Sequence, residues 1–556
     1  MSAGQQSWLS AASPVRWLRR AERPPSPSDQ LTTRILCANL YLDAQACDAV
    51  WNEFLSDPQG GWGTSPGLDL TALLRHARVA RRLLLLRDAA LLACLLAAPA
   101  TFVAEAGARH GRHGLVAAGA AMVLLYLVAR RAGWLVGRLG ARLRARFKRK
   151  REQTVRIVLL TAFAAILAGI WLASLDIVVR SLVVLAGGVV VAWTVCVAAQ
   201  FAAIRHATRC RRAAESPAQT ASRLSAAVEA RLEGVAKMNV IAYRETRAST
   251  PFIGSGLRIE HWPTSVDIRH AADPDGDGPE PFEVGDLLLF LERDWQADNP
   301  EGIRHGLRLY VHGGKLEADR DLLPSPSSPP VDRLAPETIA YRNEQRDNED
   351  FQRVFFLESL TRRDDLVVTA SARAGRRGHL LFFEVTLNAL LPLLPAIVDR
   401  VRRLPAHRRD LLYRVLREGT RHLPRHFLSA PNRLAGRLVD ARVFWRGRRL
   451  AALVAKRFRY HDYGASITAR EGLSSDNFKA PDDNVRRALE RDTVYMVTRL
   501  ARGLRAFLVE RGISTSSLDG PQSVTTIIQN WKVDTVKADI VGFGNANTFI
   551  AKAPGA

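Results

Sequence analysis

The sequence predicts an α-helical membrane unit of four spans joined to a cytoplasmic α+β domain. Apolar residues are concentrated between residues 83 and 204, and basic clusters border and interrupt that stretch. After residue 238, short apolar runs alternate with Gly and Pro, a pattern typical of strands joined by turns. We therefore expect a membrane unit near the N-terminus and a mixed domain after it.

The N-terminal part contains no predicted membrane span. Residues 1–30 are rich in Pro, Ser and Arg, a composition typical of disorder. They also lack the apolar core of a secretory signal. In residues 31–82, apolar positions recur at helical spacing on both sides of a Gly- and Pro-rich break, which predicts a cytoplasmic helical region.

Four stretches approach the length of about 20 apolar residues that a bilayer helix needs. They are 83–104, 114–130, 157–175 and 181–204. The loop 130–156 between the second and third holds eleven Arg or Lys and one acid. Since basic loops stay in the cytoplasm, this arrangement predicts a multi-pass protein of the cell (plasma) membrane with both termini cytoplasmic.

Charged residues near the spans are interpreted in the same way. Arg87 and Asp88 lie close to the cytoplasmic end of the first span, where an Arg side chain can reach the headgroups. No ionisable residue occupies the middle of a span, which disfavours coupled transport and favours an anchoring role.

The basic loop offers a candidate surface for anionic lipid. An apolar stripe of Leu139, Leu143 and Phe147 predicts an amphipathic helix on the inner leaflet. Its basic side chains would contact lipid headgroups. These are Arg142, Arg144, Arg146, Lys148, Arg149 and Lys150. The alternative is a loop that only sets the topology.

After the spans we expect a helical stalk at 205–237, an α+β domain at 238–520 and a strand-and-turn tail at 521–556. The apolar run at 379–399 approaches the length of a span, but Glu384 and two prolines favour a strand followed by a Pro-bounded turn or helix. Other strands are predicted at 239–243, 257–261, 307–311, 366–370 and 379–385, and helices at 284–293, 406–418 and 483–510.

Composition narrows the classes of partner and cofactor. The net charge of +24 suggests nucleic acid, but the absence of a zinc-finger or RNP-type motif and the scarcity of aromatic residues disfavour it. The five cysteines have no CxxC spacing and no neighbouring His cluster, so neither a disulfide framework nor a zinc site is predicted. We expect no metal site and no cofactor.

The densest group of polar residues lies at 457–470. A His beside an Asp can titrate near neutrality, and neighbouring arginines can hold an anion. The candidate ligand-binding residues are His461, Asp462, Arg457, Arg459 and Arg470. Because successive strand residues face opposite ways, His461 and Asp462 need not pair. A binding or structural role is favoured, and no catalytic residue is predicted.

Several local phrases carry a family resemblance. They are TRILCANLYLDAQACDAVWNEFL at 33–55, GLDLTALLRHARVARR at 67–82, LRLYVHGGKLEADRDLLP at 307–324, HLLFFEVTLNALLPLLPAIVDR at 379–400 and FRYHDYGASITARE at 458–471. The chain resembles a family of uncharacterised actinobacterial multi-pass membrane proteins. That family has no established activity, so the resemblance implies architecture and no mechanism.

These observations lead to one expected function and two alternatives. The expectation is a membrane anchor for a cytoplasmic sensing or scaffolding domain at the inner leaflet, with no enzyme activity indicated by any motif. The alternatives are a membrane-tethered enzyme or effector acting on a phosphate-bearing ligand, and a channel or pore. Expected partners are a bilayer with anionic headgroups and a protein partner or a second copy.

Overall fold

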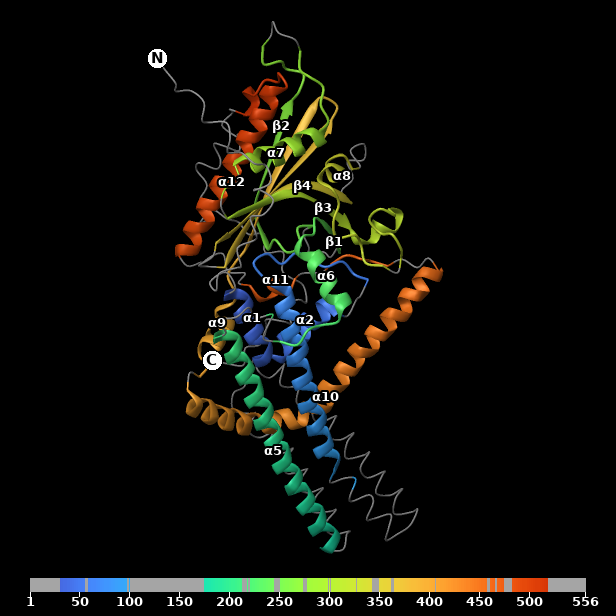
Figure 1. The fold of residues 1–556 in the computed structure, drawn as a ribbon, viewed down its shortest axis with the longest axis vertical. Coiled ribbons are helices and arrows are strands. Elements are labelled where there is room, and N and C mark those ends of the chain that lie inside the picture. The colour runs from blue at the N-terminus through green and yellow to red at the C-terminus, as the bar shows by residue number, and fades with distance from the viewer. Residues whose placement is uncertain are drawn as a thin grey trace, which may run out of the picture. The chain divides into compact units, whose positions relative to one another are not determined.

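The computed structural model describes most of the chain outside the predicted second and third spans (Figure 1). The described residues are 31–97, 100, 175–212, 218 and 221–518, apart from gaps at 56–58, 245–250, 274–277, 299, 301, 327, 343–349, 362–364, 406, 458–460, 466–467 and 475–482. Two compact units are formed. Unit 1 comprises Met1–Arg81, His206–Leu404 and Asp440–Ala556, and unit 2 comprises Arg82–Arg205 and Pro405–Val439.

Unit 1 is built on a six-stranded mixed sheet (Figure 1). Its strand order is β1-β3-β4-β5-β6-β2, and only the pair β1–β3 is parallel. The strands are β1 Val240–Tyr243, β2 Leu257–Asp267, β3 Ile303–His312, β4 Phe351–Thr361, β5 Leu366–Arg377 and β6 Leu380–Leu390. β5 and β6 form a hairpin whose turn begins at Gly378 with φ +60°, a left-handed conformation that glycine adopts without strain.

The first face of the sheet is apolar and carries the core. Alternate residues of each strand point to the same side. In β3 these are Leu307, Leu309 and Val311, each at most 3% exposed. They belong to one apolar cluster with helices α7 Val284–Asp298 and α12 Asp483–Glu510. Trp295 of α7 is fully buried there. The two helices thus cover this face and leave the opposite face to other segments.

Shorter elements complete unit 1. They are α1 Leu31–Leu42, α2 Ala44–Leu55, α6 Ala226–Ala236, η4 Gly313–Ala318, α8 Pro336–Tyr341, α9 Pro395–Arg402, α11 Ala469–Leu473 and η5 Ser516–Leu518, with parts of a helix at 70–97, α5 Leu175–Arg212 and α10 Arg408–Arg457.

Helix α1 is buried on nearly all sides. The Tyr41 hydroxyl contacts His76 Nδ1 at 2.9 Å, and the Cys210 thiol lies 3.6 Å from the same nitrogen. Burial raises the pKa of Cys210 to about 12, so this thiol stays protonated at neutral pH.

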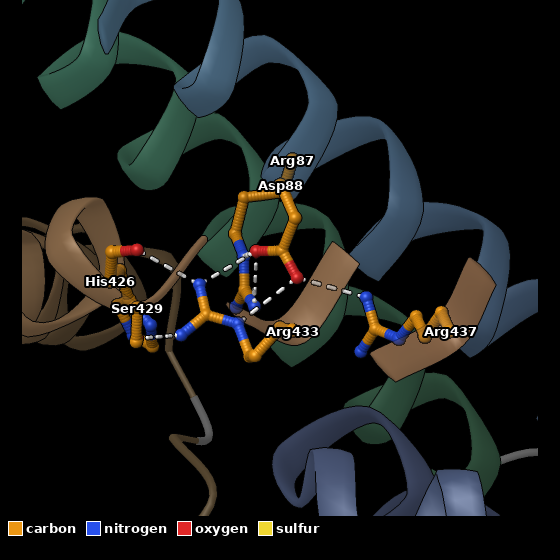
Figure 2. A network of polar contacts seen from close by, with 6 residues as sticks. All are labelled: Arg87, Asp88, His426, Ser429, Arg433 and Arg437. Carbon is orange, nitrogen blue, oxygen red and sulfur yellow. Dashed lines mark hydrogen bonds and ion pairs between the residues drawn. The ribbon is translucent and has the colours of Figure 1, made fainter. Parts of the chain in front are cut away.

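Unit 2 is organised around one buried carboxylate, that of Asp88 (Figure 2). Asp88 is fully buried and lies on the helix 70–97. Arg433 of α10 donates to both of its oxygens, at 3.0 and 2.8 Å. Arg437 donates to Asp88 Oδ2 at 2.9 Å and Arg87 to Oδ1 at 3.0 Å. Since a buried carboxylate is tolerated only when it is paired, this network fixes α10 against the helix that carries Asp88.

Arg433 also contacts its own helix between two prolines. Pro424 and Pro431 lie inside α10. Arg433 donates to the carbonyl oxygen of His426 at 2.9 Å and to the Ser429 hydroxyl. One guanidinium therefore contacts both the Pro-containing part of α10 and Asp88.

Three of the predictions are wrong. They are the four-span fold class, the membrane-anchor function with its enzyme, effector and channel alternatives, and the multi-pass location in the plasma membrane. In the described part of the chain, one helix, Ala186–Arg212, is long and apolar enough to cross a membrane. A single such helix is weak evidence for a span. The observed fold is α+β, with a mixed six-stranded sheet.

The physical reason lies in what the apolar residues contact. Leu91, Ala192 and Cys196 form a cluster with Ala430 of α10, so part of the supposed lipid-facing surface packs against protein. Asp88 is fully buried within unit 2 and the Arg87 side chain is 10% exposed, whereas a pair at the headgroups would be hydrated. Part of the membrane prediction falls outside the described residues. This part comprises the span 114–130, the span 157–175 up to residue 174, and the loop 130–156 with its six predicted lipid-contacting residues.

The ambiguous run at 379–399 is a strand followed by a Pro-bounded helix. β6 occupies Leu380–Leu390 at the centre of an antiparallel trio, between β5 and β2. Helix α9 begins at Pro395, a position where proline is well tolerated because its missing N–H needs no partner. The strand-and-helix interpretation of this segment is confirmed.

Replacement of Asp88 by Ala should lower the free energy of unfolding by about 3–5 kcal/mol, because three guanidinium groups lose their buried partner. Chemical denaturation of the full chain measures this loss. As a control, Asp399→Ala removes a half-exposed carboxylate 3.9 Å from Arg403 and should cost under about 1 kcal/mol. Equal losses in the two variants would contradict a central role for Asp88.

The same contribution should depend on pH. Burial alone would raise the pKa of Asp88, but hydrogen bonds from Arg433 and the charge of Arg87 hold it below its ordinary value. The stability supplied by a depressed carboxyl pKa is complete above the unfolded value of about 3.9. It is lost as pH falls through the folded pKa. The difference in stability between wild type and Asp88→Ala should therefore narrow below about pH 4.

Candidate functional site

The second face of the sheet is lined by buried polar side chains, which we call the polar face. Its members alternate with the core residues along β3–β6 and are each at most 2% exposed. They are Arg308, Tyr310, Glu358, Thr369, Ser371 and Asn388. Such a concentration is unusual, because Arg, Glu and Asn are rarely fully buried.

The strand register brings these residues together. Glu358 of β4 is opposite Thr369 of β5, which is opposite Asn388 of β6. In the next row Ser371 is opposite Thr386. Since opposite residues on one face have Cβ atoms about 4.5–5.5 Å apart, the hydroxyl and amide groups form a continuous patch across three strands.

Arg308 and Glu358 form a buried ion pair at one side of the patch. Arg308 Nη2 lies 3.1 Å from Glu358 Oε2, and its guanidinium carbon lies 3.5 Å from the centre of the Phe356 ring. Arg304 reaches the other oxygen of Glu358 at 3.2 Å. Burial alone would lower the pKa of Arg308, but the charge of Glu358 raises it. Arg308 therefore remains charged, and the two arginines together hold Glu358 in place.

A glycine-rich loop at 252–256 lies beside this patch and is held by one carboxylate. Glu471 Oε1 accepts hydrogen bonds from the backbone N–H groups of Gly254 and Gly256, at 2.8 and 3.0 Å. Both glycines have positive φ, +89° and +87°. A Cβ on Gly254 would lie 2.0 Å from the carbonyl oxygen of Thr64, so no larger residue fits. The loop holds Ser255, 1% exposed, and Phe252, whose ring meets that of Tyr310 edge-on at 5.1 Å.

The other oxygen of Glu471 caps its own short helix. Oε2 accepts from the backbone N–H and the hydroxyl of Thr468, at 2.9 and 3.1 Å. Thr468 in turn accepts from the Glu471 N–H, which completes a capping box. Burial raises the pKa of Glu471, while these backbone hydrogen bonds oppose the rise. The carboxylate is thus fully used in structure and joins α11 to the loop.

Arg470 is the fully buried neighbour of Glu471. Its Nη2 donates to the carbonyl oxygen of Asp365 at 2.6 Å. Asp365 itself has a φ of +52°, a conformation uncommon outside glycine. Burial lowers the pKa of Arg470 to about 10, and the charge of Asp365 opposes the change. The guanidinium therefore remains positively charged at neutral pH in a site without solvent.

The polar face and its surroundings are short of hydrogen-bond partners. Buried side-chain atoms normally find a partner in protein, water or ligand. In the part of the chain that the structure describes, the following atoms have none: Arg470 Nε and Nη1, Asn388 Nδ2 and Oδ1, and the hydroxyl oxygens of Thr369 and Ser371. Three of these are nitrogens that only donate, so the group is suited to a partner that carries acceptors.

The predicted residues His461 and Asp462 lie at the end of β1. Asp462 pairs with Arg244 at 3.1 Å and accepts the N–H of Gly464 at 2.9 Å. The His461 N–H donates to Glu317 at 3.3 Å, and its ring meets that of Tyr463 edge-on. These contacts stabilise the chain segment 461–465, which pairs with Ala242 of β1.

The five predicted ligand-binding residues are not brought into one arrangement. Arg470 contacts the turn between β4 and β5, whereas Asp462 contacts the segment after β1. Arg457 ends α10, and its side chain lies outside the described set, as does all of Arg459. A ligand-binding role for His461 and Asp462 stays a prediction.

The polar face was missed by the sequence analysis although a signal was present. In β5 the polar residues Thr369, Ser371 and Arg373 alternate with Val368, Ala370 and Ala372. Such alternation is ordinarily interpreted as one buried and one solvated face. The burial of both faces follows from contacts made by segments distant in the chain, which no local pattern reveals.

Removal of an unpaired hydroxyl should not weaken the fold. Thr369→Val is expected to leave the free energy of unfolding unchanged or raise it by up to about 1 kcal/mol, because the desolvation penalty of the hydroxyl disappears. Ser359→Ala is the matched control, because that hydroxyl donates to Asp492 at 2.7 Å on the opposite face; its loss should cost about 1.5–3 kcal/mol. Urea denaturation measures the free energy of unfolding of both variants. Equal losses in the two would contradict the assignment of the Thr369 hydroxyl as unpaired.

Comparison with known proteins identifies one family. The AbeC-like domain model matches residues 261–547. The match begins in β2 and includes the polar face and α11. No curated protein and no solved structure matches the chain. Because the matched segment covers more than half of the 556 residues, the chain belongs to the family of proteins with an AbeC-like domain.

Proposed function

We propose that this chain is a binding protein whose polar face holds a small organic anion, such as a carboxylate, beside the loop 252–256. The observation that carries the proposal is the set of buried, unpartnered donors on Arg470 and Asn388. Buried donors without a partner cost about 1–3 kcal/mol each. A ligand rich in acceptor oxygens would satisfy them and recover that free energy on binding.

Arginine favours an oxyanion over a neutral ligand. A guanidinium presents its donors in a planar fork that matches the two oxygens of a carboxylate. The Nε and one Nη of Arg470 are unpartnered within the described residues, and its remaining hydrogen bond goes to a backbone carbonyl. These two nitrogens lie on different sides of the guanidinium, so they can donate to two separate acceptor oxygens, which supports a ligand rich in acceptors.

The composition of the polar face favours binding over catalysis. Its six residues include no His or Cys, and its one acid, Glu358, is held by two arginines. A general acid or base needs a pKa near the working pH, and none of these side chains is an obvious candidate. Hydroxyl and amide groups instead provide directional contacts that select a ligand.

Polar residues continue along the same face of the sheet from the buried patch towards the β5–β6 turn. Along β5 and β6 the rows beyond Ser371 continue with Arg373 opposite Glu384, which are both half-buried. His261 of β2 is exposed and contacts the Thr386 hydroxyl at 3.1 Å. The same face of the sheet thus becomes steadily more accessible towards the β5–β6 turn, which gives a small ligand a direction of entry.

Arg470→Met should abolish ligand binding with little loss of stability. Thermal denaturation of the full chain is followed with and without acetate, succinate, benzoate and inorganic phosphate, with choline as the cationic control. A bound ligand raises the melting temperature because it stabilises the folded state. At a free ligand concentration of 100 times the Kd this stabilisation is about 2.7 kcal/mol. In Arg470→Met this rise should disappear, while the free protein should lose at most about 2 kcal/mol, since Met fills the volume and removes two unpaired donors.

The control is Arg400→Met, which removes a guanidinium paired with Asn39 and Asp43 on the α1–α2 segment. This variant should respond to the same anion as wild type does. The proposal fails if no anion stabilises the wild type at millimolar concentration. It also fails if Arg470→Met retains the response, or if Arg400→Met loses it equally.

A further inference from the structure

Helix α12 has a solvent-facing side with its own chemistry, away from the sheet. Its inner side contributes Leu489, Met496, Leu500 and Phe507 to the core. Its outer side carries a surface stripe, called the groove below, whose described lining residues all belong to α12. The groove follows residues at spacings of three and four along the helix, so it is one continuous stripe running from Arg487 to Arg502.

The two ends of the groove are basic and lack partners. Arg487 and Arg502 are both exposed, and neither has a hydrogen bond or ion pair among the described residues. They are fifteen residues apart, which corresponds to about 22 Å along an α-helix. Exposed arginines held on a rigid helix attract carboxylates with little loss of conformational freedom in the backbone.

The centre of the groove is apolar and fixed. Val494 and Tyr495 are 36% and 44% exposed. The Tyr495 ring meets that of Trp295 edge-on, at a centroid distance of 6.2 Å. Arg499 is held beside the same Trp295 ring and pairs with Asp294 at 2.7 Å. The apolar centre is therefore preorganised, which reduces the entropy that a partner must remove on binding.

The charge pattern selects between two classes of macromolecule. A nucleic acid backbone presents phosphates at every nucleotide and has no aliphatic side chain to cover the exposed Val494 and Tyr495 at the centre. An acidic protein segment can place its carboxylates at the two ends and an apolar side chain between them. Aromatic residues and arginine are also the residues enriched at protein interfaces.

We infer that the outer side of α12 is a docking surface for an acidic helical segment of a partner protein. The segment carries carboxylates about fifteen residues apart, opposite Arg487 and Arg502, and an apolar residue that covers Val494 and Tyr495. This surface lies on the opposite side of the core from the polar face. Docking there is independent of ligand binding at the polar face.

The test is fluorescence anisotropy with a labelled helical peptide of 20 residues that has Glu clusters fifteen residues apart and Leu at its centre. A second peptide has Gln in place of Glu, and a third probe is a labelled 20-nucleotide oligo-dT. The wild-type full chain should bind the acidic peptide, and the Gln peptide should bind at least about tenfold more weakly. Arg487→Glu with Arg502→Glu should weaken binding of the acidic peptide by about tenfold or more.

The matched control changes the net charge equally at a different place. Arg320 and Arg333 are exposed residues outside the groove, and Arg320→Glu with Arg333→Glu should change binding by less than about threefold. Tyr495→Ser should also weaken binding, with circular dichroism unchanged. The proposal is overturned if both double variants lose binding equally, if the Gln peptide binds as well as the acidic one, or if oligo-dT binds more tightly and competes for the groove.

Discussion

The structure of unit 1 depends on one buried carboxylate, Glu471. One of its oxygens caps α11 through Thr468, and the other holds the N–H groups of Gly254 and Gly256. Two segments more than two hundred residues apart in the chain are thereby joined. The two positive-φ glycines allow the backbone to approach a carboxylate and leave no room for a larger residue. With this loop in place, Ser255 and Phe252 are held against the second face of the sheet.

Buried carboxylates perform the same physical task in both units. Asp88 in unit 2, like Glu471 in unit 1, joins segments that are remote in sequence. The partners differ, since Asp88 is bound by arginine side chains and Glu471 mainly by backbone N–H groups. The ion pairs of Asp88 exchange desolvation for attraction and gain little net stability, but they make incorrect pairings costly. The Asp88 site therefore specifies which segments pack together more than it adds to the free energy of folding.

Local patterns predicted much of the secondary structure, and contacts between distant residues explain what they missed. The predicted helix 483–510 coincides with α12, and the strands expected at 239–243, 307–311 and 366–370 overlap β1, β3 and β5. β4 was missed because Arg353 and Glu358 interrupt its apolar run. The membrane prediction failed because hydropathy counts apolar residues without regard to what they contact. The pairing of Asp88 with Arg433 could not be predicted from a local pattern, because the two residues lie 345 positions apart in the chain. Of the candidate site, only Arg470 was selected from the sequence, since the burial of the polar face is a tertiary property.

The unpaired atoms around the polar face raise a question of energy that bears on function. A penalty of about 1–3 kcal/mol for each buried donor or acceptor without a partner is large beside a total stability of about 5–15 kcal/mol. A sequence that needed only a stable sheet could place Val or Leu at Thr369, Ser371 and Asn388, as it does at neighbouring Val367 and Leu390. Functional sites are the places where proteins keep such locally unfavourable groups. The retention of one incompletely paired arginine, one unpaired amide and two unpaired hydroxyls in one region is therefore better explained by recognition of a ligand than by stability of the fold.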